Sequence, residues 1–234
     1  ALFQGIRNLE YRGYDSCGIA LMKKNNLVVR KNTGGVDEFF RKNNILSAKS
    51  TIGIAHTRWA THGSVTHENS HPFMSCDEAF AVVHNGIISN YRLLREDLIG
   101  EGHKFYSETD TEVIPHLLEK YYEKYKNVET AFLSTLNSLE GTFAVVLISS
   151  YHPSQIFCAR RESPLMIGIG DEQKFVGSDF NAFIDYTKNA IIIEDGEYAI
   201  ISRDSYVVKS FLTREEVVKS ITKIEWDSET AKKG

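Results

Sequence analysis

The segment from His56 to Gly63 is the most informative stretch of the chain. It reads His-Thr-Arg-Trp-Ala-Thr-His-Gly, and so brings together a guanidinium, an indole, two hydroxyls and two imidazoles. The preceding run, residues 51–55, is short, partly β-branched and bounded by polar residues, which predicts a strand that ends where the polar segment begins. Because binding sites are common on the loops that follow strands, we expect a small polar ligand to be held here.

Three further polar clusters interrupt the apolar patterning. They are residues 11–16 (Tyr-Arg-Gly-Tyr-Asp-Ser), 84–86 (His-Asn-Gly) and 107–112 (Ser-Glu-Thr-Asp-Thr-Glu). On local evidence alone, an Asn-Gly pair after an apolar run most often forms a β-turn. The functional alternative is an oxyanion hole, in which the Asn85 amide and the Gly86 backbone N–H donate to a developing negative oxygen.

Arg58 and Asp110 carry opposite charges that could together recognise an amino acid. The guanidinium of Arg58 can grip a carboxylate through two parallel hydrogen bonds, but a structural or surface ion pair is an equally good interpretation of an arginine on its own. Asp110 can bind an ammonium group, or it can cap the helix expected to follow it, which is the commoner local outcome. Neither residue alone decides between its two roles.

Several histidines are crowded between residues 56 and 84, which raises the question of a metal site. They are His56, His62, His67, His71 and His84. Residues 67–71 read His-Glu-Asn-Ser-His, which has HExxH spacing, but no helical periodicity is predicted around them, as that zinc motif requires. No pair has HxH spacing, and no cysteine falls at a familiar ligand interval. We therefore predict no metal, and we expect these imidazoles to be structural or to line a pocket.

The composition is that of an ordinary globular protein. The chain has 234 residues, of which 42% are hydrophobic, enough for a substantial core. With 27 basic and 31 acidic side chains the net charge is −4, which gives no reason to expect a nucleic acid or a membrane surface as partner. The three cysteines lack CxxC spacing and predict neither disulfides nor a zinc ribbon, which fits a reducing cytoplasm. No apolar run approaches the roughly 20 residues that span a bilayer, and we expect no leader or anchor.

Hydrophobic periodicity predicts many strands and a few helices. Beside residues 51–55, strands are expected over 19–22 and 27–29 as a hairpin, and over 79–83, 144–148, 156–159, 165–169, 175–177, 191–193, 198–201 and 206–208. Helices are expected over 36–48, 91–99, 112–125 and 128–139, with Asp110 and Thr111 as start signals for the third. Strands and helices grouped in blocks predict an α+β layered fold. Residues 1–10 have helical spacing without a start signal, and 227–234 have the composition of a linker.

Together these motifs resemble the glutamine amidotransferase domains of glucosamine-6-phosphate synthases. The resemblance covers nearly the whole chain and rests on residues 9–16, 56–63, 83–88 and 107–112, with later support from 163–165, 177–179 and 194–196. Other amidotransferases share the general fold, but the sequence from Arg58 to Gly63 favours the glucosamine-6-phosphate synthase subfamily. The resemblance implies an Ntn-hydrolase fold over residues 1–226, a four-layer αββα sandwich of two antiparallel sheets, followed by a linker at 227–234.

The resemblance also implies how L-glutamine would be held. Arg58, helped by Thr61 and His62, would bind the α-carboxylate, and Asp110 would bind the α-ammonium. Trp59 would lie near the path of released ammonia. Charge pairing of this kind selects an amino acid, because an unpaired charge in a dry site costs several kcal/mol. The implied partner is a downstream sugar-isomerase domain that binds fructose 6-phosphate, within a full-length homo-oligomer, and no cofactor is implied.

The catalytic groups follow from the same resemblance. Asn85 and Gly86 would form the oxyanion hole, and Arg12 would lie close to the nucleophile. In this family the nucleophile is an N-terminal cysteine whose own α-amino group serves as base. Residue 1 of this sequence is alanine, and the cysteines at 17, 76 and 158 are interpreted as structural or incidental. We therefore expect the first strand, with its cysteine, to lie ahead of Ala1.

Three alternatives stay open at this stage. The chain could be an amidotransferase domain that serves another ammonia acceptor. It could be a catalytically inactive module that binds glutamine and regulates, because the sequence has no qualified nucleophile. It could also be a self-processing amidase of the same fold, although Arg58 and Asp110 argue against substrates without an α-carboxylate.

Overall fold

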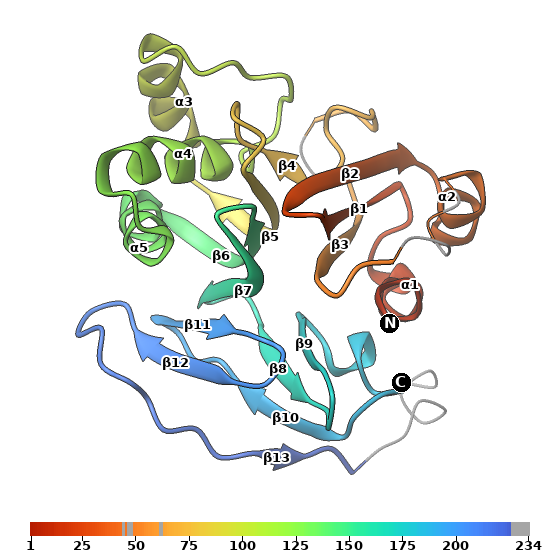
Figure 1. Ribbon diagram of the computed structural model, residues 1–234. Helices are drawn as coiled ribbons and strands as arrows, with labels where there is room; N and C mark the ends of the chain where they lie inside the picture. Colours follow the sequence, from red (N-terminus) through yellow and green to blue (C-terminus); the bar gives the residue numbers. More distant parts are fainter. Residues whose placement is uncertain (44, 46–48, 61–62, 226–234) are drawn as a thin grey trace.

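A six-stranded antiparallel sheet forms the centre of the molecule (Figure 1). In spatial order its strands are β12 (Tyr206–Ser210), β11 (Glu197–Ile201), β7 (His152–Arg161), β6 (Gly141–Ser149), β5 (Phe80–Ile88) and β4 (Phe73–Met74). The computed structural model describes residues 1–43, 45, 49–60 and 63–225. β5 and β6 pair along their whole length, from Phe80 opposite Ser149 to Ile88 opposite Gly141. This long ladder holds the 84–86 cluster inside the sheet.

Three helices cover one face of this sheet (Figure 1). They are α3 (Tyr91–Gly100), α4 (Val113–Tyr125) and α5 (Val128–Ser138). Their apolar faces meet alternate residues of the strands, as in the contact of Leu118 and Phe132 with Val82 and Leu147 in one buried cluster. The side chain of Asn127 caps α5 by accepting the backbone N–H of Thr130 at 2.8 Å. Burial of this apolar face fixes the helices to the sheet.

Two smaller antiparallel sheets pack against the other face. One has the order β2 (Asn26–Thr33), β1 (Ser16–Lys23), β3 (Gly53–Arg58), and the other has the order β13 (Thr222–Lys223), β10 (Asn189–Ile192), β8 (Met166–Ile169), β9 (Lys174–Gly177). Ala20 and Ile54 of the first sheet pack against Val83 of the large sheet. Ile167 and Ile191 of the second pack against its other end. The second β layer is therefore divided in two.

Short helices form the outer layer. They are α1 (Leu2–Asn8), η1 (Glu10–Arg12), α2 (Val36–Asn43) and η3 (Phe180–Ala182). Ile6, Val36 and Phe39 pack on Cys17 and Ile19, which face outward from β1. The order of layers is helix, sheet, sheet, helix. The predicted α+β four-layer sandwich is confirmed, with the difference that its second layer consists of two sheets.

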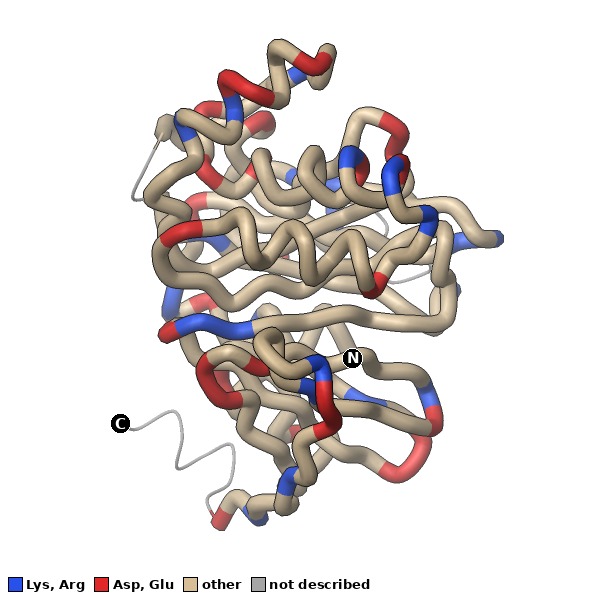
Figure 2. Tube along the Cα trace, turned by 90° about the vertical axis from the view of Figure 1, so that its left-hand side faces the viewer, with Lys and Arg blue, Asp and Glu red and all other residues tan. Residues whose placement is uncertain are grey.

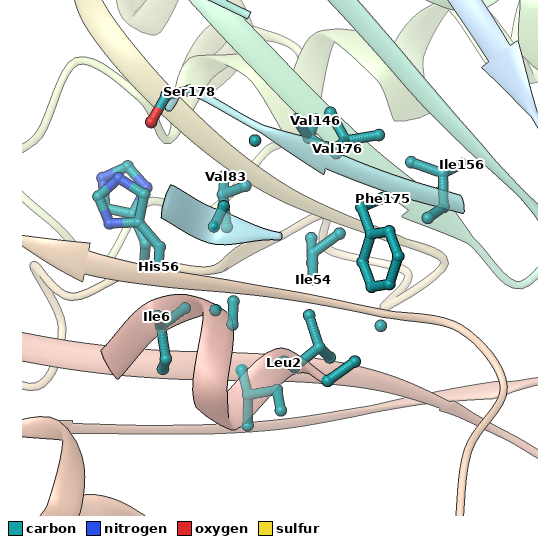
Figure 3. Close-up of a pocket in the computed structure, with 18 of the residues that line it drawn as sticks. Leu2, Ile6, Ile54, His56, Val83, Val146, Ile156, Phe175, Val176 and Ser178 are labelled. Carbon is teal, nitrogen blue, oxygen red and sulfur yellow. The ribbon is translucent and has the colours of Figure 1, made fainter. Parts of the chain in front are cut away.

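An apolar cavity separates these two sheets. In the described residues β3 pairs only with β1, and β9 pairs only with β8, so that one edge of each strand is left to border the cavity. Ile54, Val83 and Phe175 surround it, with His56 at the end opposite Phe175 (Figure 3). The division of the second layer thus creates a space that reaches the polar end of β3.

Two local expectations are wrong, and tertiary contacts explain both. Asn85 and Gly86 form no turn but continue β5 through Ile88, because pairing with β6 outweighs the turn preference of the dipeptide. Asp110 does not cap α4, whose N-cap is Glu112 without a side-chain bond; the Asp110 carboxylate instead accepts the backbone N–H of Ile88 at 2.7 Å. Of the helix expected over 36–48, α2 ends at Asn43, and residues 44 and 46–48 lie outside the described residues, as do Trp226 and the 227–234 segment.

The charged residues are spread over the surface. In the view of Figure 2 acidic and basic residues alternate along the described trace without forming a face of one sign, in keeping with the small net charge. Among the described helices, none combines the length and the apolar character needed to cross a bilayer.

Candidate active site

One cavity of about 1130 Å³ contains every predicted site residue that the structure describes. The set comprises Arg12, Arg58, Trp59, Asn85, Gly86 and Asp110, which come from η1, the end of β3, the middle of β5 and the segment before α4. Thr61 and His62 lie outside the described residues. The cavity has an apolar end between β3 and β9 and a polar end at the tips of β3 and β5. A volume of this size is ample for an amino acid.

His56 orients the Asn85 side chain. Its Nε2 lies 2.8 Å from Asn85 Oδ1, and both residues are half-buried. Burial lowers the pKa of His56 to about 4, despite the bond to Asn85, so the ring is neutral at pH 7. With Nε2–H donating to Oδ1, the amide nitrogen of Asn85 remains the donor that a ligand in the cavity meets. Sequence reasoning predicted the strand that carries His56 but not this contact.

Gly86 is required by the backbone at its position. Its φ of +129° is a conformation that side chains rarely adopt, and a Cβ built on it would lie 2.1 Å from the carbonyl oxygen of Thr142 on β6. Gly86 is exposed and Asn85 is half-buried, whereas the first five residues of β5 are buried. The strand therefore brings backbone and the Asn85 amide to the cavity wall at adjacent residues.

Arg58 ends β3 and is 7% exposed. Burial lowers the pKa of its guanidinium, while the charges of Asp15 and Asp110 act in the opposite direction. Its Nη1 donates to the carbonyl of Ser64 at 3.4 Å. The backbone that follows Arg58 is fixed at Ala60, whose N–H donates to Asp15 Oδ2 at 2.8 Å. A buried cation held in this way can bind a carboxylate.

Asp110 lies across the cavity opening at the end of β5. Its Oδ2 accepts the backbone N–H of Ile88 at 2.7 Å, and its Oδ1 accepts the hydroxyl of Thr111 at 3.5 Å. Thr111 Oγ1 is in turn 2.9 Å from His84 Nδ1. Asp110 is only partly buried. The carboxylate is therefore fixed in direction and still open to a ligand.

Arg12 and Trp59 border the cavity from its rim. Arg12 Nη1 donates to the carbonyl and the hydroxyl of Ser178, both at 3.4 Å, and lies 3.7 Å from a carboxylate oxygen of Asp179. Trp59 is 57% exposed, and its ring centroid is 5.8 Å from that of Tyr14. These contacts join η1 to the loop after β9 and so define the outer rim of the cavity.

Three buried histidines lie beneath the polar end. The rings of His56 and His71 are stacked with centroids 4.1 Å apart, and His71 Nδ1 accepts the backbone N–H of His84 at 3.4 Å. Burial lowers the pKa of all three. The expectation that these imidazoles line a pocket is therefore met by His56, His71 and His84, whereas His67 is exposed with its side chain 59% accessible.

A hydrogen-bond network that sequence reasoning missed connects two of the polar clusters. Asn69 is 2% exposed, its side-chain nitrogen donates to the carbonyl of Ser64 at 3.0 Å and to Glu108 Oε2 at 3.1 Å, and its Oδ1 accepts the N–H of Glu108 at 2.9 Å. The segment after Arg58 is thereby tied to the one that carries Asp110. Buried asparagine carries no sequence signal of its own, so only the structure could find it.

The three cysteines are free thiols away from Asn85 and Gly86. Cys17 and Cys158 are buried, which raises the pKa of each thiol to about 12. Cys17 packs with α1 and α2, and Cys158 lies between the large and the four-stranded sheets. Cys76 is exposed in the turn between β4 and β5. None of them lines the cavity.

The solved structures that resemble this chain define its class. A glutamine phosphoribosylpyrophosphate amidotransferase from B. subtilis in complex with ADP and GMP matches with a TM-score of 0.77 and 26% identity, over 89% of this chain and 46% of that one. An allosteric regulatory enzyme of purine biosynthesis matches with a TM-score of 0.78, also at 26% identity, over 90% of this chain and 46% of that one. The fold is thus the Ntn-type amidotransferase sandwich.

The family follows from the sequence comparison. A family model described as a glutamine amidotransferase domain matches residues 56–185. This chain belongs to that family, whose substrate is glutamine. The matched region includes Arg58, Asn85, Gly86 and Asp110, whereas Arg12 lies before it.

Curated relatives match the chain over its whole length. Glutamine–fructose-6-phosphate aminotransferases (isomerizing) from Pyrococcus horikoshii and Thermococcus kodakarensis are 43% identical over 233 residues and 44% identical over 232. The chain is covered to 100% and 99%, and these relatives to 39% and 38%. The chain therefore spans about two fifths of the length of the curated relatives it matches.

Proposed function

We propose that this domain hydrolyses L-glutamine to glutamate and ammonia, and that the ammonia serves the amination of fructose 6-phosphate to glucosamine 6-phosphate in a sugar-isomerase domain of the same protein. The proposal rests on four groups that line one cavity. They are the oriented amide of Asn85, the backbone of Gly86, the buried guanidinium of Arg58 and the fixed carboxylate of Asp110. The acceptor is inferred from the names of the relatives, all glutamine–fructose-6-phosphate aminotransferases.

Charge complementarity would hold the substrate. The guanidinium of Arg58 pairs with the α-carboxylate of glutamine, with help from Thr61 and His62, and Asp110 pairs with its α-ammonium. Arg58 and Asp110 lie close enough for their charges to influence each other, so the two ends of an amino acid can satisfy both. The side-chain amide of glutamine then extends toward Asn85.

The oxyanion hole would stabilise the carbonyl oxygen of the substrate amide. A thiolate attacks the amide carbon, the carbonyl oxygen becomes negative, and the Asn85 amide and the Gly86 N–H donate to it. The α-amino group that took the thiol proton returns it to the amide nitrogen, so that collapse of the tetrahedral intermediate breaks the C–N bond and expels ammonia past Trp59, and water then releases glutamate from the thioester. Arg12, at the rim of the cavity, lies near the nucleophile.

The nucleophile would come from an extended segment that fills the apolar end of the cavity. The edges of β3 and β9 that pair with no described strand border this space, and Ile54, Val83, Phe175 and Val176 line it (Figure 3). A strand laid there pairs with both edges and makes the second β layer continuous. We place the N-terminal cysteine on this strand, with residues 1–226 as the remainder of the domain and 227–234 as the linker to the isomerase domain.

A second candidate is a glutamine-binding module that regulates without catalysis. The observation that favours it is the position of Cys17, Cys76 and Cys158, none of which lines the cavity. Both candidates use the same Arg58 and Asp110 contacts. They differ only in whether a thiol reaches the amide carbon.

One experiment separates the two. The full-length natural protein is incubated with a glutamine analogue that carries an electrophile in place of the amide, its intact mass is measured, and the labelled peptide is sequenced. A single label on an N-terminal cysteine, with glutamate release that fructose 6-phosphate stimulates, supports the aminotransferase. Binding of glutamine without label or glutamate release supports the regulatory module, and a label on one of the three internal cysteines contradicts the proposed mechanism.

A further inference from the structure

Four potential metal ligands converge outside the cavity, behind the segment that carries Asp110. They are Cys76, His103, His116 and Glu119, and their ligand atoms all lie within 4.8 Å of one another. Cys76 lies in the β4–β5 turn, His103 follows α3, and the other two occupy adjacent turns of α4. Helices α3 and α4 and the β4–β5 hairpin lie side by side (Figure 1). Residues far apart in sequence therefore meet at one point.

The distances among these atoms approach those of a tetrahedral zinc site. Cys76 Sγ is 3.9 Å from His103 Nδ1 and 3.5 Å from His116 Nδ1. Glu119 Oε2 is 3.5 Å from His103 Nδ1 and 3.9 Å from His116 Nδ1. Around Zn²⁺, with bonds of about 2.0–2.3 Å, tetrahedral ligand atoms lie about 3.3–3.6 Å apart. These four separations are close to that range, and the longest separation in the cluster, up to 4.8 Å, must shorten for the site to close on an ion.

The surroundings resemble those of a coordinated metal. His116 Nδ1 faces the cluster, and the opposite nitrogen, Nε2, is buried 4.0 Å from Glu112 Oε1, beyond hydrogen-bond distance. A small shift would complete the carboxylate–histidine hydrogen bond that orients metal ligands. The backbone N–H of Lys104 donates to Cys76 Sγ at 3.4 Å, and that of Cys76 donates to Glu119 Oε2 at 2.8 Å. These bonds fix the directions of the thiol and the carboxylate.

The cluster is shielded on the protein side and reachable from solvent. The side chains of His103, His116 and Glu119 are 12%, 2% and 10% exposed, whereas Cys76 is exposed. A second cavity, of about 580 Å³, is lined by Cys76 and His116 among others. An ion can therefore enter from this side.

We propose that Cys76, His103, His116 and Glu119 bind one structural Zn²⁺. Thiolate and imidazole ligands favour zinc over magnesium or calcium, and four protein ligands leave no position for catalysis. On binding, the thiol gives its proton to solvent and the sulfur bonds to the metal. The ion would clamp the β4–β5 turn and the end of α3 to α4, on both sides of the segment 101–112.

The zinc site would be connected to the candidate active site through Glu112. Glu112 accepts the backbone N–H groups of Tyr106 and Ser107 at 2.9 and 2.7 Å, and so holds the segment from which Asp110 projects. Glu112 also faces His116. Loosening the cluster would therefore loosen the position of Asp110.

The competing interpretation is a network of hydrogen bonds and ion pairs without metal. Burial lowers the pKa of His116, but the neighbouring carboxylates of Glu112 and Glu119 raise it more, so the net shift of the pKa is upward. A protonated His116 between two carboxylates would account for the same neighbours. The two interpretations predict opposite results for metal content.

The test uses the full-length natural protein purified without chelator. Elemental analysis should find about one zinc per chain that survives dialysis against metal-free buffer. After removal of the metal by a strong chelator, addition of Zn²⁺ alone should restore a higher Tm. Co²⁺ in its place should give thiolate-to-cobalt charge-transfer absorption, which identifies sulfur as a ligand.

Variants locate the ion. Cys76→Ser changes an exposed turn residue and should leave the fold intact by circular dichroism, yet it should abolish the charge-transfer band and release the zinc. His152→Asn, an exposed histidine on β7 outside the cluster, is the matched control and should retain both. Metal-free wild type with no change of Tm on adding Zn²⁺ would overturn the proposal in favour of the ion-pair network, and zinc retained equally in both variants would place it elsewhere.

Discussion

Replacement of Asn85 by aspartate changes one donor into an acceptor at the wall of the cavity. The two side chains have the same shape, so the bond from His56 Nε2 to Oδ1, 2.8 Å in the native protein, can persist. What changes is the second terminal atom, which becomes an oxygen that cannot donate and that carries charge. Asn85→Asp therefore tests the proposed oxyanion contact without removing volume.

The expected loss is large and concerns kcat. Removal of one oxyanion donor costs about 2.7–4 kcal/mol, or about 10²–10³ in kcat. A carboxylate about 4 Å from the developing oxyanion adds about 4 kcal/mol of repulsion at an effective dielectric constant of about 20. The KM for glutamine should change by less than about threefold, because the contact forms fully only in the transition state.

Steady-state glutamate release by the full-length protein provides the assay. His56→Phe is a graded companion that removes the hydrogen bond to Asn85 and keeps an aromatic ring against His71, for an expected loss of about 1 kcal/mol, about fivefold in kcat. Asn25→Asp, the same change in an exposed turn, is the control and should have no effect. If Asn85→Asp keeps kcat within about threefold of wild type, the amide is not a transition-state donor and the reasoning fails.

Three further predictions follow from the geometry. Arg58→Ala should raise the KM for glutamine by about 100-fold or more, since breaking a buried charge pair costs about 3–5 kcal/mol, and an unchanged KM would refute the assignment. Gly86→Ala should lower the free energy of unfolding in urea by about 2 kcal/mol or more, whereas Gly100→Ala, at a position in α3 where a Cβ meets no atom within 4 Å, should cost less. Unfolding in urea should show a lower free energy of unfolding at pH 5 than at pH 7, because the folded pKa of His56 is about 4 and that of His71 is also lowered. Below about pH 6.5 the unfolded chain binds more protons than the folded one, so stability falls as the pH falls. Equal stabilities at the two pH values would contradict the burial of neutral rings.

The sequence predicted elements whose periodicity is strong and local. The strand at 144–148 and the helix at 128–139 were expected within a few residues of β6 and α5, because burial of one face sets their pattern. The end of the helix expected over 36–48 could not be predicted in this way. The very short strands β4 and β13 were missed, since two residues carry no period.

Long-range contacts account for what local reasoning could not predict. Asn85 and Gly86 form a turn in most short peptides, but here pairing opposite Ala144 and Phe143 keeps them extended. Local sequence favours Asp110 as a helix cap, but its carboxylate accepts the backbone N–H of Ile88 instead. The crowded histidines from residue 56 to 84 predict no metal, and only one member of the proposed zinc site, Cys76, falls in that part of the chain. The proposed zinc ligands lie 27 to 43 residues from Cys76, at intervals that match no short motif.

The histidines of the candidate site add no charge to those of Arg58 and Asp110. The three imidazoles beneath Asn85 are neutral at pH 7 because burial lowers their pKa values, so Arg58 and Asp110 supply the formal charges nearest to the ligand. If the rings were protonated, they would compete with the ammonium group for Asp110 and repel the guanidinium. In the neutral ring with its proton on Nε2, His56 donates to Asn85 Oδ1 and leaves the Asn85 amide nitrogen to the ligand. Burial of the histidines thus contributes to selectivity for an amino acid, and the contact of His56 with Asn85 orients the oxyanion donor.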